Sequence, residues 1–192
     1  MLNINLHRQT MLLILREIYS RPSLASSLGF KGGTAVYLLY NLPRFSVDLD
    51  FDLIAKDKEK EIFEDLKKIA AKFGKLEQAT IKHNTLFYLL SYRSGLQKLK
   101  LEISRRPDLS SYELRQYLGI PLLAMTRADM AANKLVALVN RKQLANRDIF
   151  DVHFFLKTQW PINIDLVEKR TGKKYPNYLD DCLNLVKKVS PD

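Results

Sequence analysis

The stretch from Val47 to Ile54 reads VDLDFDLI and alternates apolar with acidic residues. A period of two is typical of a β-strand, because successive side chains point to opposite faces of a sheet. The apolar set packs on one face, and the opposite face carries Ser46, Asp48, Asp50 and Asp52. The stretch therefore predicts a strand with one buried face and one row of carboxylates.

Working outward from this strand, the sequence predicts further elements on both sides. Two helices are expected within residues 2–28, a turn over Gly29 to Gly33 and a short apolar helix over Thr34 to Tyr40. A charged amphipathic helix follows over residues 56–73 and ends at Gly74. Three strand-like runs come next, at residues 76–83, 86–92 and 99–104.

After Pro107 the pattern is helical. Helices are expected at 127–140 and at 146–157, and two more within 164–189. The order of helices, strand-rich centre and helices predicts an α+β fold, with a mixed β-sheet, flanking helices and a helical C-terminal lobe. The expected domains are a catalytic lobe over residues 1–106 and the helical lobe over 107–192.

The chain is basic, with 31 Lys and Arg against 21 Asp and Glu and a net charge of +10. Such a balance favours an anionic partner such as a nucleotide or a nucleic acid, although a generally basic surface explains it equally well. The lone Cys182 excludes a disulfide within the chain. The N-terminal apolar run at residues 11–15 is too short to span a membrane. We therefore expect a cytoplasmic protein without membrane contact.

Two carboxylates two residues apart on one strand face repel each other unless a cation lies between them. Asp48 and Asp50 could bind magnesium, which prefers carboxylate oxygens, water and phosphates. A solvated edge strand would also explain the pair. Glu102 lies in an alternating run and could be a third ligand, or it could simply pair with Lys100 on its own strand face. Three acids on two strands would suit a two-metal site.

Gly32 and Gly33 open the short helix just upstream of the acidic strand. A glycine-lined helix N-terminus presents free N–H groups and the positive end of the helix dipole to a phosphate. A turn that needs flexible residues is the alternative explanation.

Three strings of this sequence resemble the AbiEii and MenT family of toxin-like nucleotidyltransferases, within the DNA polymerase β-like superfamily. They are Lys31-Gly32-Gly33-Thr34-Ala35, Arg44-Phe45-Ser46-Val47-Asp48-Leu49-Asp50-Phe51, and a later group of Lys134 to Leu138, Arg141 and Arg147 to Val152. The resemblance covers roughly residues 31–155.

The resemblance implies a role for each matching residue. Asp48 and Asp50 would bind Mg²⁺, of which two ions are expected, with Glu102 as the third carboxylate. Lys134 would neutralise the triphosphate, and Asp148, preferred to Asp151, would complete the catalytic set. The implied nucleotide-binding residues are Lys31, Gly32, Gly33, Thr34, Arg44, Ser46, Lys134 and Arg141. Ser46 also falls where some family members are silenced by phosphorylation.

The resemblance implies a toxin of a toxin–antitoxin or phage-defence pair, which transfers NMP from an NTP to an RNA acceptor, the 3′ end of a tRNA, and has a cognate antitoxin. A protein acceptor would use the same chemistry. A catalytically inactive RNA-binding or antitoxin-like protein is the alternative from another class. The sequence leaves the oligomeric state open.

Overall fold

The structure is a computed structural model that describes residues 1–107, 109–140 and 145–187. The chain divides into two compact units. The first comprises Met1–Asp108 and Tyr112–Ala124, and the second comprises Leu109–Ser111 and Met125–Asp192. No described helix is both long enough and apolar enough to cross a membrane.

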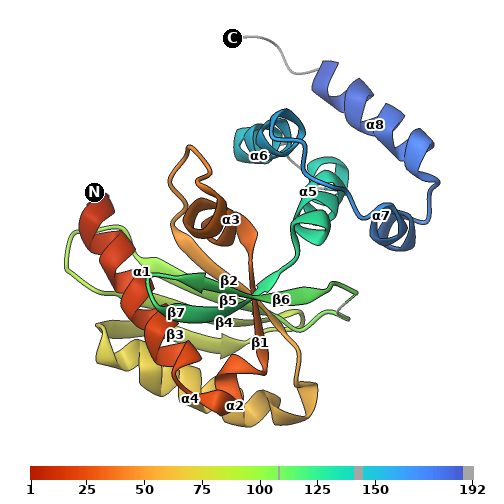
Figure 1. Cartoon of the computed structure of the whole chain (residues 1–192). Coiled ribbons are helices and arrows are strands. Elements are labelled where there is room, and N and C mark those ends of the chain that lie inside the picture. Colours follow the sequence, from red (N-terminus) through yellow and green to blue (C-terminus); the bar gives the residue numbers. More distant parts are fainter. Residues whose placement is uncertain (108, 141–144, 188–192) are drawn as a thin grey trace. The chain divides into compact units, whose positions relative to one another are not determined.

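The first unit is built on a mixed sheet of seven strands in the order β3-β4-β5-β2-β1-β7-β6 (Figure 1). The strands are β1 Leu28–Lys31, β2 Asp48–Leu53, β3 Lys75–Ile81, β4 Thr85–Ser91, β5 Leu99–Ser104, β6 Tyr112–Tyr117 and β7 Ile120–Met125. The predicted α+β fold with a mixed sheet is confirmed.

The acidic strand β2 lies near the middle of this sheet. It pairs antiparallel with β1 and parallel with β5. Its apolar residues Leu49 and Phe51 are fully buried, as are Leu101 and Ile103 of β5. The alternation predicted from the sequence thus gives one apolar face across neighbouring strands.

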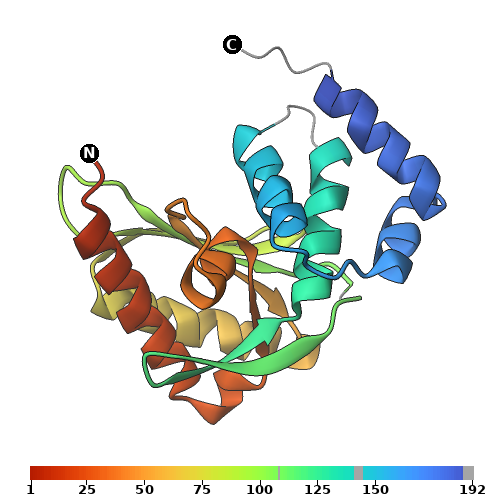
Figure 2. The same cartoon turned by 45° about the horizontal axis from the view of Figure 1, so that its top comes forward.

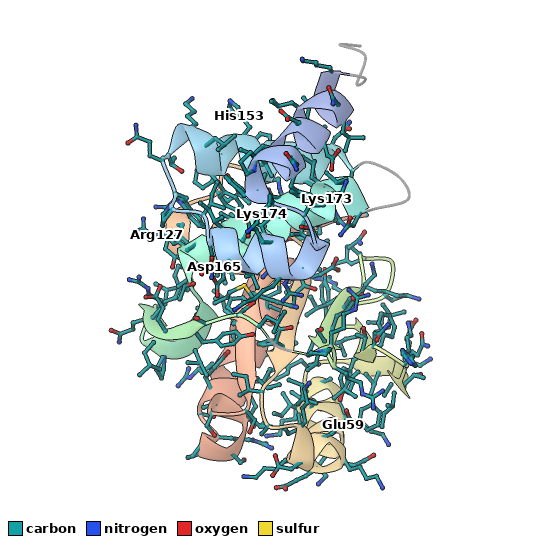
Figure 3. All side chains as sticks on the ribbon, turned by 90° about the vertical axis from the view of Figure 1, so that its right-hand side faces the viewer. Glu59, Arg127, His153, Asp165, Lys173 and Lys174 are labelled. Atoms are coloured by element: carbon teal, nitrogen blue, oxygen red, sulfur yellow. The ribbon has the colours of Figure 1, made fainter. Side chains whose placement is uncertain are left out.

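Helices α1 (Ile4–Tyr19) and α4 (Glu59–Lys72) lie on the apolar side of the sheet (Figure 2). The buried Tyr88 of β4 donates its hydroxyl hydrogen to the Phe63 carbonyl of α4 at 3.0 Å. At the start of α4, Glu59 (labelled in Figure 3) accepts hydrogen bonds from the Arg105 guanidinium at 2.6 and 2.9 Å. The sequence predicted one amphipathic helix over residues 56–73. In the structure this segment is a short 3₁₀ turn, Lys56–Lys58, followed by α4.

Helix α3 (Gly32–Tyr40) lies over the opposite, acidic side of the sheet, and the short α2 (Pro22–Ala25) follows α1. Thr34 of α3 donates its hydroxyl hydrogen to the main-chain carbonyl of Asp48 at 2.5 Å. The start of α3 is thereby fixed to the start of β2.

Two sequence predictions in this unit were wrong. The residues before Gly32 form strand β1 and not a turn, because Leu28 and Phe30 are fully buried and the strand pairs with β2. The helical pattern predicted after Pro107 is instead the hairpin of β6 and β7, closed by the two-residue turn Leu118-Gly119. β6 is an edge strand in which no residue is buried, so it lacks the alternation of a half-buried strand.

The second unit is helical, as predicted. Its helices are α5 Arg127–Asn140, α6 Asn146–Lys157, α7 Ile164–Thr171 and α8 Tyr175–Lys187. Leu135 and Leu138 of α5 pack with Val167 and Tyr178 in a buried cluster. Two ion pairs lie at the surface (Figure 3). Nζ of Lys173 is 2.6 Å from Oδ2 of Asp181, and Nζ of Lys174 is 3.0 Å from Oε2 of Glu168.

Candidate active site

Three of the predicted site residues are brought together on one face of the sheet. In the parallel pair of β2 and β5, Asp50 is the partner of Glu102, and Asp48 is the partner of Lys100. Partner residues in a sheet point to the same face, so Asp48, Asp50 and Glu102 share the face opposite the apolar core. All three are half-buried. The sheet register alone therefore builds a carboxylate face from two strands that lie far apart in the sequence.

Gly32 brings the N-terminus of α3 against this face. Its φ is +79°, in the left-handed region that favours glycine. A β-carbon at this position would collide with the side chain of Asp50. A residue without a side chain is therefore required where the Asp50 carboxylate meets the first turn of α3.

Gly33 is the second glycine of this turn and has different neighbours. A β-carbon there would come within 2.8 Å of Nη2 of Arg44 and 2.9 Å of Oγ of Ser46. Arg44, Ser46 and the first turn of α3 therefore lie together, beside Asp48. The backbone N–H groups of a helix N-terminus and a guanidinium are both suited to binding phosphate.

Asp52, the third acid of β2, has a different environment from Asp48 and Asp50. Only 6% of its surface is exposed. Its Oδ1 lies 2.5 Å from Nζ of Lys31, and its Oδ2 accepts a hydrogen bond from the Tyr112 hydroxyl at 2.8 Å. The sequence pattern could not separate Asp52 from its neighbours, and its network links β2 to β1 and β6. Lys31, which the resemblance assigns to the nucleotide, has its ammonium group in this network.

Lys100 adds a positive charge to the carboxylate face. Its Nζ lies 4.0 Å from Oδ1 of Asp48, its partner in the register. The sequence left open whether Lys100 pairs with Glu102 on its own strand, and in the structure Lys100 instead approaches Asp48 on the neighbouring strand. Because Lys100 is 44% exposed, the contact is weakly stabilising.

His7 of α1 is fully buried behind the start of β2. Its Nε2 lies 2.8 Å from the Val47 carbonyl, which can only accept, so Nε2 carries the hydrogen. Its Nδ1 lies 2.7 Å from the Tyr92 hydroxyl oxygen, and when the ring is neutral Nδ1 accepts the hydrogen bond that this hydroxyl donates. Burial lowers the pKa of His7, while the Val47 hydrogen bond and the charge of Asp48 act in the opposite direction. A neutral His7 thus holds the residue that precedes Asp48, and no sequence signal marked it.

The carboxylates have the donor chemistry of a site for a hard divalent cation, which takes oxygen ligands. Across the described residues, however, no group of three or more His, Cys, Asp or Glu side chains is already gathered as metal ligands. A magnesium ion can bind through only one or two carboxylates when phosphates and water complete its shell, so a pair such as Asp48 and Asp50 is compatible with this chemistry.

The other two predicted catalytic residues belong to the second unit. Nζ of Lys134 on α5 lies 2.8 Å from Oδ1 of Asp148 and 2.8 Å from Oδ2 of Asp151, both on α6. Both aspartates are fully buried, so burial does not distinguish them. Arg141 lies outside the described residues. Arg127 is the first residue of α5 (Figure 3), and its Cζ lies 5.9 Å from the centroid of the Trp160 ring.

A comparison with protein families matches residues 13–183 to the family described as nucleotidyl transferase AbiEii toxin, type IV toxin–antitoxin system. No protein of curated function matches the chain in sequence.

Several solved structures are similar in fold. JHP933 of Helicobacter pylori is 26% identical, with 99% of this chain and 84% of that one covered and a TM-score of 0.58. A candidate nucleotidyltransferase of the same organism is 28% identical, with coverages of 97% and 84% and a TM-score of 0.60. The nucleotidyltransferase toxin MenT4 of Mycobacterium tuberculosis is 20% identical, with coverages of 86% and 63% and a TM-score of 0.60.

Proposed function

This chain belongs to the AbiEii nucleotidyltransferase toxin family, and on that premise we propose that it transfers NMP from an NTP to the 3′ end of a tRNA. The family shows that the chain is a nucleotidyltransferase of the toxin type, and nucleotidyltransferases generally use an NTP and a divalent metal ion. The choice of RNA, of magnesium and of the residues below is our proposal. The observation that carries it is the carboxylate face of Asp48, Asp50 and Glu102 beside the glycine turn of α3.

Asp48 and Asp50 would hold Mg²⁺, with Glu102 completing the acidic face, and two ions would fit the chemistry of this class. Bound there, the metal supplies positive charge for the triphosphate and lowers the pKa of the attacking hydroxyl. The N–H groups at Gly32 and Gly33, with Arg44, would bind phosphate oxygens. Thr34 keeps Asp48 in place through its main-chain carbonyl.

In the reaction, the hydroxyl oxygen of the acceptor bonds to the α-phosphorus and gives up its proton to water. The bond from that phosphorus to the bridging oxygen breaks, and pyrophosphate leaves. The residues on the carboxylate face contribute by positioning and charge, which dominate catalysis of phosphoryl transfer.

The net charge of +10 favours RNA over a small acceptor, since neutralised phosphates release counterions. A cognate antitoxin is the expected protein partner of a toxin of this family. Lys134 and Asp148 remain predicted members of the catalytic set. The predicted nucleotide-binding residues also include Lys31, Ser46 and Arg141.

The test is incubation of the full chain with each radiolabelled NTP, Mg²⁺ and total tRNA, followed by denaturing electrophoresis. We expect label in the tRNA band from wild type and none from Asp48→Ala. The exposed Asp57 of the 3₁₀ turn gives the matched control, since Asp57→Ala removes the same charge away from the face. Label found only in protein bands would mean that the acceptor is a protein and not RNA. Transfer by Asp48→Ala at the wild-type level would refute the assigned site.

A further inference from the structure

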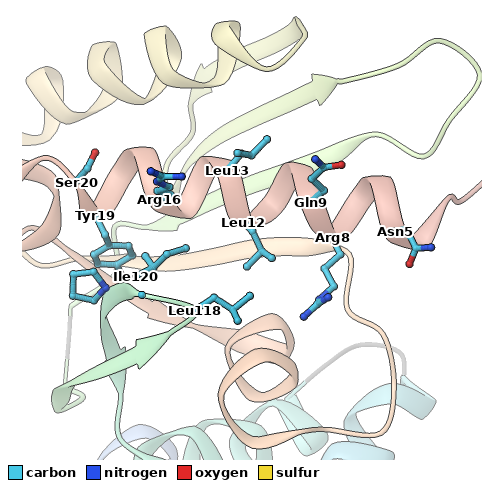
Figure 4. A pocket seen from close by; sticks show the side chains of 12 residues that line it. Asn5, Arg8, Gln9, Leu12, Leu13, Arg16, Tyr19, Ser20, Leu118 and Ile120 are labelled. Carbon is cyan, nitrogen blue, oxygen red and sulfur yellow. The ribbon is translucent and has the colours of Figure 1, made fainter.

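A groove of about 870 Å³ lies between helix α1 and the turn that joins β6 to β7 (Figure 4). It belongs wholly to the first unit and shares no residue with the carboxylate face. Figure 4 shows Arg8 and Leu12 projecting from α1 on the side where Leu118 lies at the tip of the hairpin.

The turn residue Leu118 breaks two local rules at once. Its φ is +48° and that of Gly119 is +78°, which corresponds to a hairpin turn favouring Asn-Gly. A leucine in the left-handed region is strained, and this one is also 72% exposed. Local rules are broken most often at functional positions, so Leu118 indicates a binding surface.

The α1 side of the groove combines apolar and basic residues. Arg8, Leu12 and Arg16 follow one another at intervals of four residues and so form one stripe along the helix. The two arginines are eight residues apart, or about 12 Å along the axis at 1.5 Å per residue. The lining, all of it within the described part of the chain, contains no Asp or Glu.

Arg8 is already partly oriented. Its Nη2 donates a hydrogen bond to the Tyr117 hydroxyl at 2.6 Å, which holds the guanidinium against the end of β6. Its Nε is buried and meets no hydrogen-bond acceptor among the described residues. This buried atom is out of reach of a carboxylate from outside the chain, so a partner's acid would bind the other guanidinium nitrogens through charge-assisted hydrogen bonds.

We propose that this groove docks an acidic amphipathic helix of a partner protein. An apolar side chain of the partner would pack between Leu12 and Leu118, and carboxylates two to three helical turns apart would bind Arg8 and Arg16. The exposed Leu13 and Leu118 favour a protein over RNA, and the two arginines in a lining without Asp or Glu favour an acidic one. In helix-in-groove docking an amphipathic helix lays its apolar face into a hydrophobic groove, and complementary charges at the edges add specificity.

The probe is a fluorescein-labelled 14-residue helical peptide with leucines on one face and glutamates elsewhere, titrated with the full chain and followed by fluorescence anisotropy. A peptide with lysine in place of every glutamate should bind at least tenfold more weakly. Arg16→Glu should weaken binding of the acidic peptide by a similar factor.

Leu118→Asn is the decisive variant, because asparagine suits the left-handed turn and removes the apolar contact. We expect at least tenfold weaker peptide binding, an unchanged rate of nucleotidyl transfer and a melting temperature no lower than wild type. Leu114→Asn is its control, since Leu114 is 77% exposed on β6 and does not line the groove. Equal binding of the acidic and basic peptides, or wild-type binding by Leu118→Asn, would overturn the proposal. The proposal would also be overturned if a short single-stranded RNA bound where the peptide does not and if Leu118→Asn abolished that RNA binding.

Discussion

The side chain of Asp50 occupies the space that a β-carbon on Gly32 would need. This contact joins a strand that carries the acids to the helix N-terminus that faces them, and both residues belong to the first unit. The close approach explains why a glycine stands at the start of α3. It also makes the carboxylate face sensitive to a single methyl group.

We predict that Gly32→Ala lowers the transfer rate by about a hundredfold, because a displacement of about 1 Å costs that much at a catalytic site. It should also destabilise the fold by about 1–2 kcal/mol, since alanine is strained at φ +79°. Steady-state kinetics and thermal unfolding measure the two effects.

Gly95→Ala is the matched control for backbone strain. Gly95 has a φ of +74°, and nothing lies within 4 Å of the position of its β-carbon. The same loss of stability with full activity is expected. If Gly32→Ala were as active as Gly95→Ala, the contact with Asp50 would have no catalytic meaning.

His7 should make stability depend on pH. Burial lowers its pKa in the folded state below the ordinary value of 6.5, so the unfolded chain binds more protons below about pH 6.5. Stability is therefore full above that pH and falls as the pH decreases, by up to about 1.4 kcal/mol per pH unit. Denaturant unfolding of wild type and His7→Gln between pH 5 and pH 8 tests this. The difference between the two proteins should increase as the pH rises from 5 to about 6.5 and stay constant above it, and a difference independent of pH would contradict the prediction.

Lys134 is expected to be a structural as well as a functional residue. Replacing it by methionine leaves Asp148 and Asp151 buried without their shared cation, which costs about 3–5 kcal/mol for a buried pair that loses one partner. Chemical denaturation of Lys134→Met should show this loss, whereas Arg147→Met, at an exposed position of α6, should change stability little. A Lys134→Met variant with wild-type stability would disprove the structural part of this role.

A negative charge at Ser46 should inactivate the enzyme. Ser46 lies two residues before Asp48, the first residue of β2. Residues two apart in an extended chain lie about 7 Å apart, and like charges at that distance repel by about 2 kcal/mol at an effective dielectric constant of about 20. Ser46→Glu should therefore transfer nucleotides roughly tenfold more slowly or worse, while Ser46→Ala stays active. Ser94→Glu, in an exposed loop, is the control for added charge. Normal activity and metal affinity of Ser46→Glu would exclude phosphorylation here as an off-switch.

The sequence predicted most of what depends on local pattern. The alternation around Asp48 and Asp50 determined both faces of β2, and the limits predicted for α6 agree with the structure. Strand β1 was missed because four residues containing a glycine resemble a turn until their partner strand is known. The sheet edge at β6 was missed because none of its residues is buried, so no apolar alternation marks the strand.

The candidate site shows the same division between local and long-range information. Spacing placed Asp52 on the same face as Asp48 and Asp50, but only the structure shows that it is buried with Lys31 and Tyr112. Likewise, the register with Glu102 depends on a pairing between residues about fifty positions apart, which no local pattern contains. The role of His7 depends on contacts with Val47 and Tyr92 of the same kind.

The central claim is that the face of Asp48 and Asp50 binds an NTP together with Mg²⁺, and its most direct test is thermal unfolding with both ligands. With a non-hydrolysable NTP analogue at about 100 times its dissociation constant, linkage adds about 2.7 kcal/mol. We predict that wild type and Asp57→Asn are stabilised only when Mg²⁺ and the analogue are present together, and that Asp50→Asn is not stabilised. Equal stabilisation of Asp50→Asn, or no stabilisation of wild type by Mg²⁺ and the analogue together, would contradict the account.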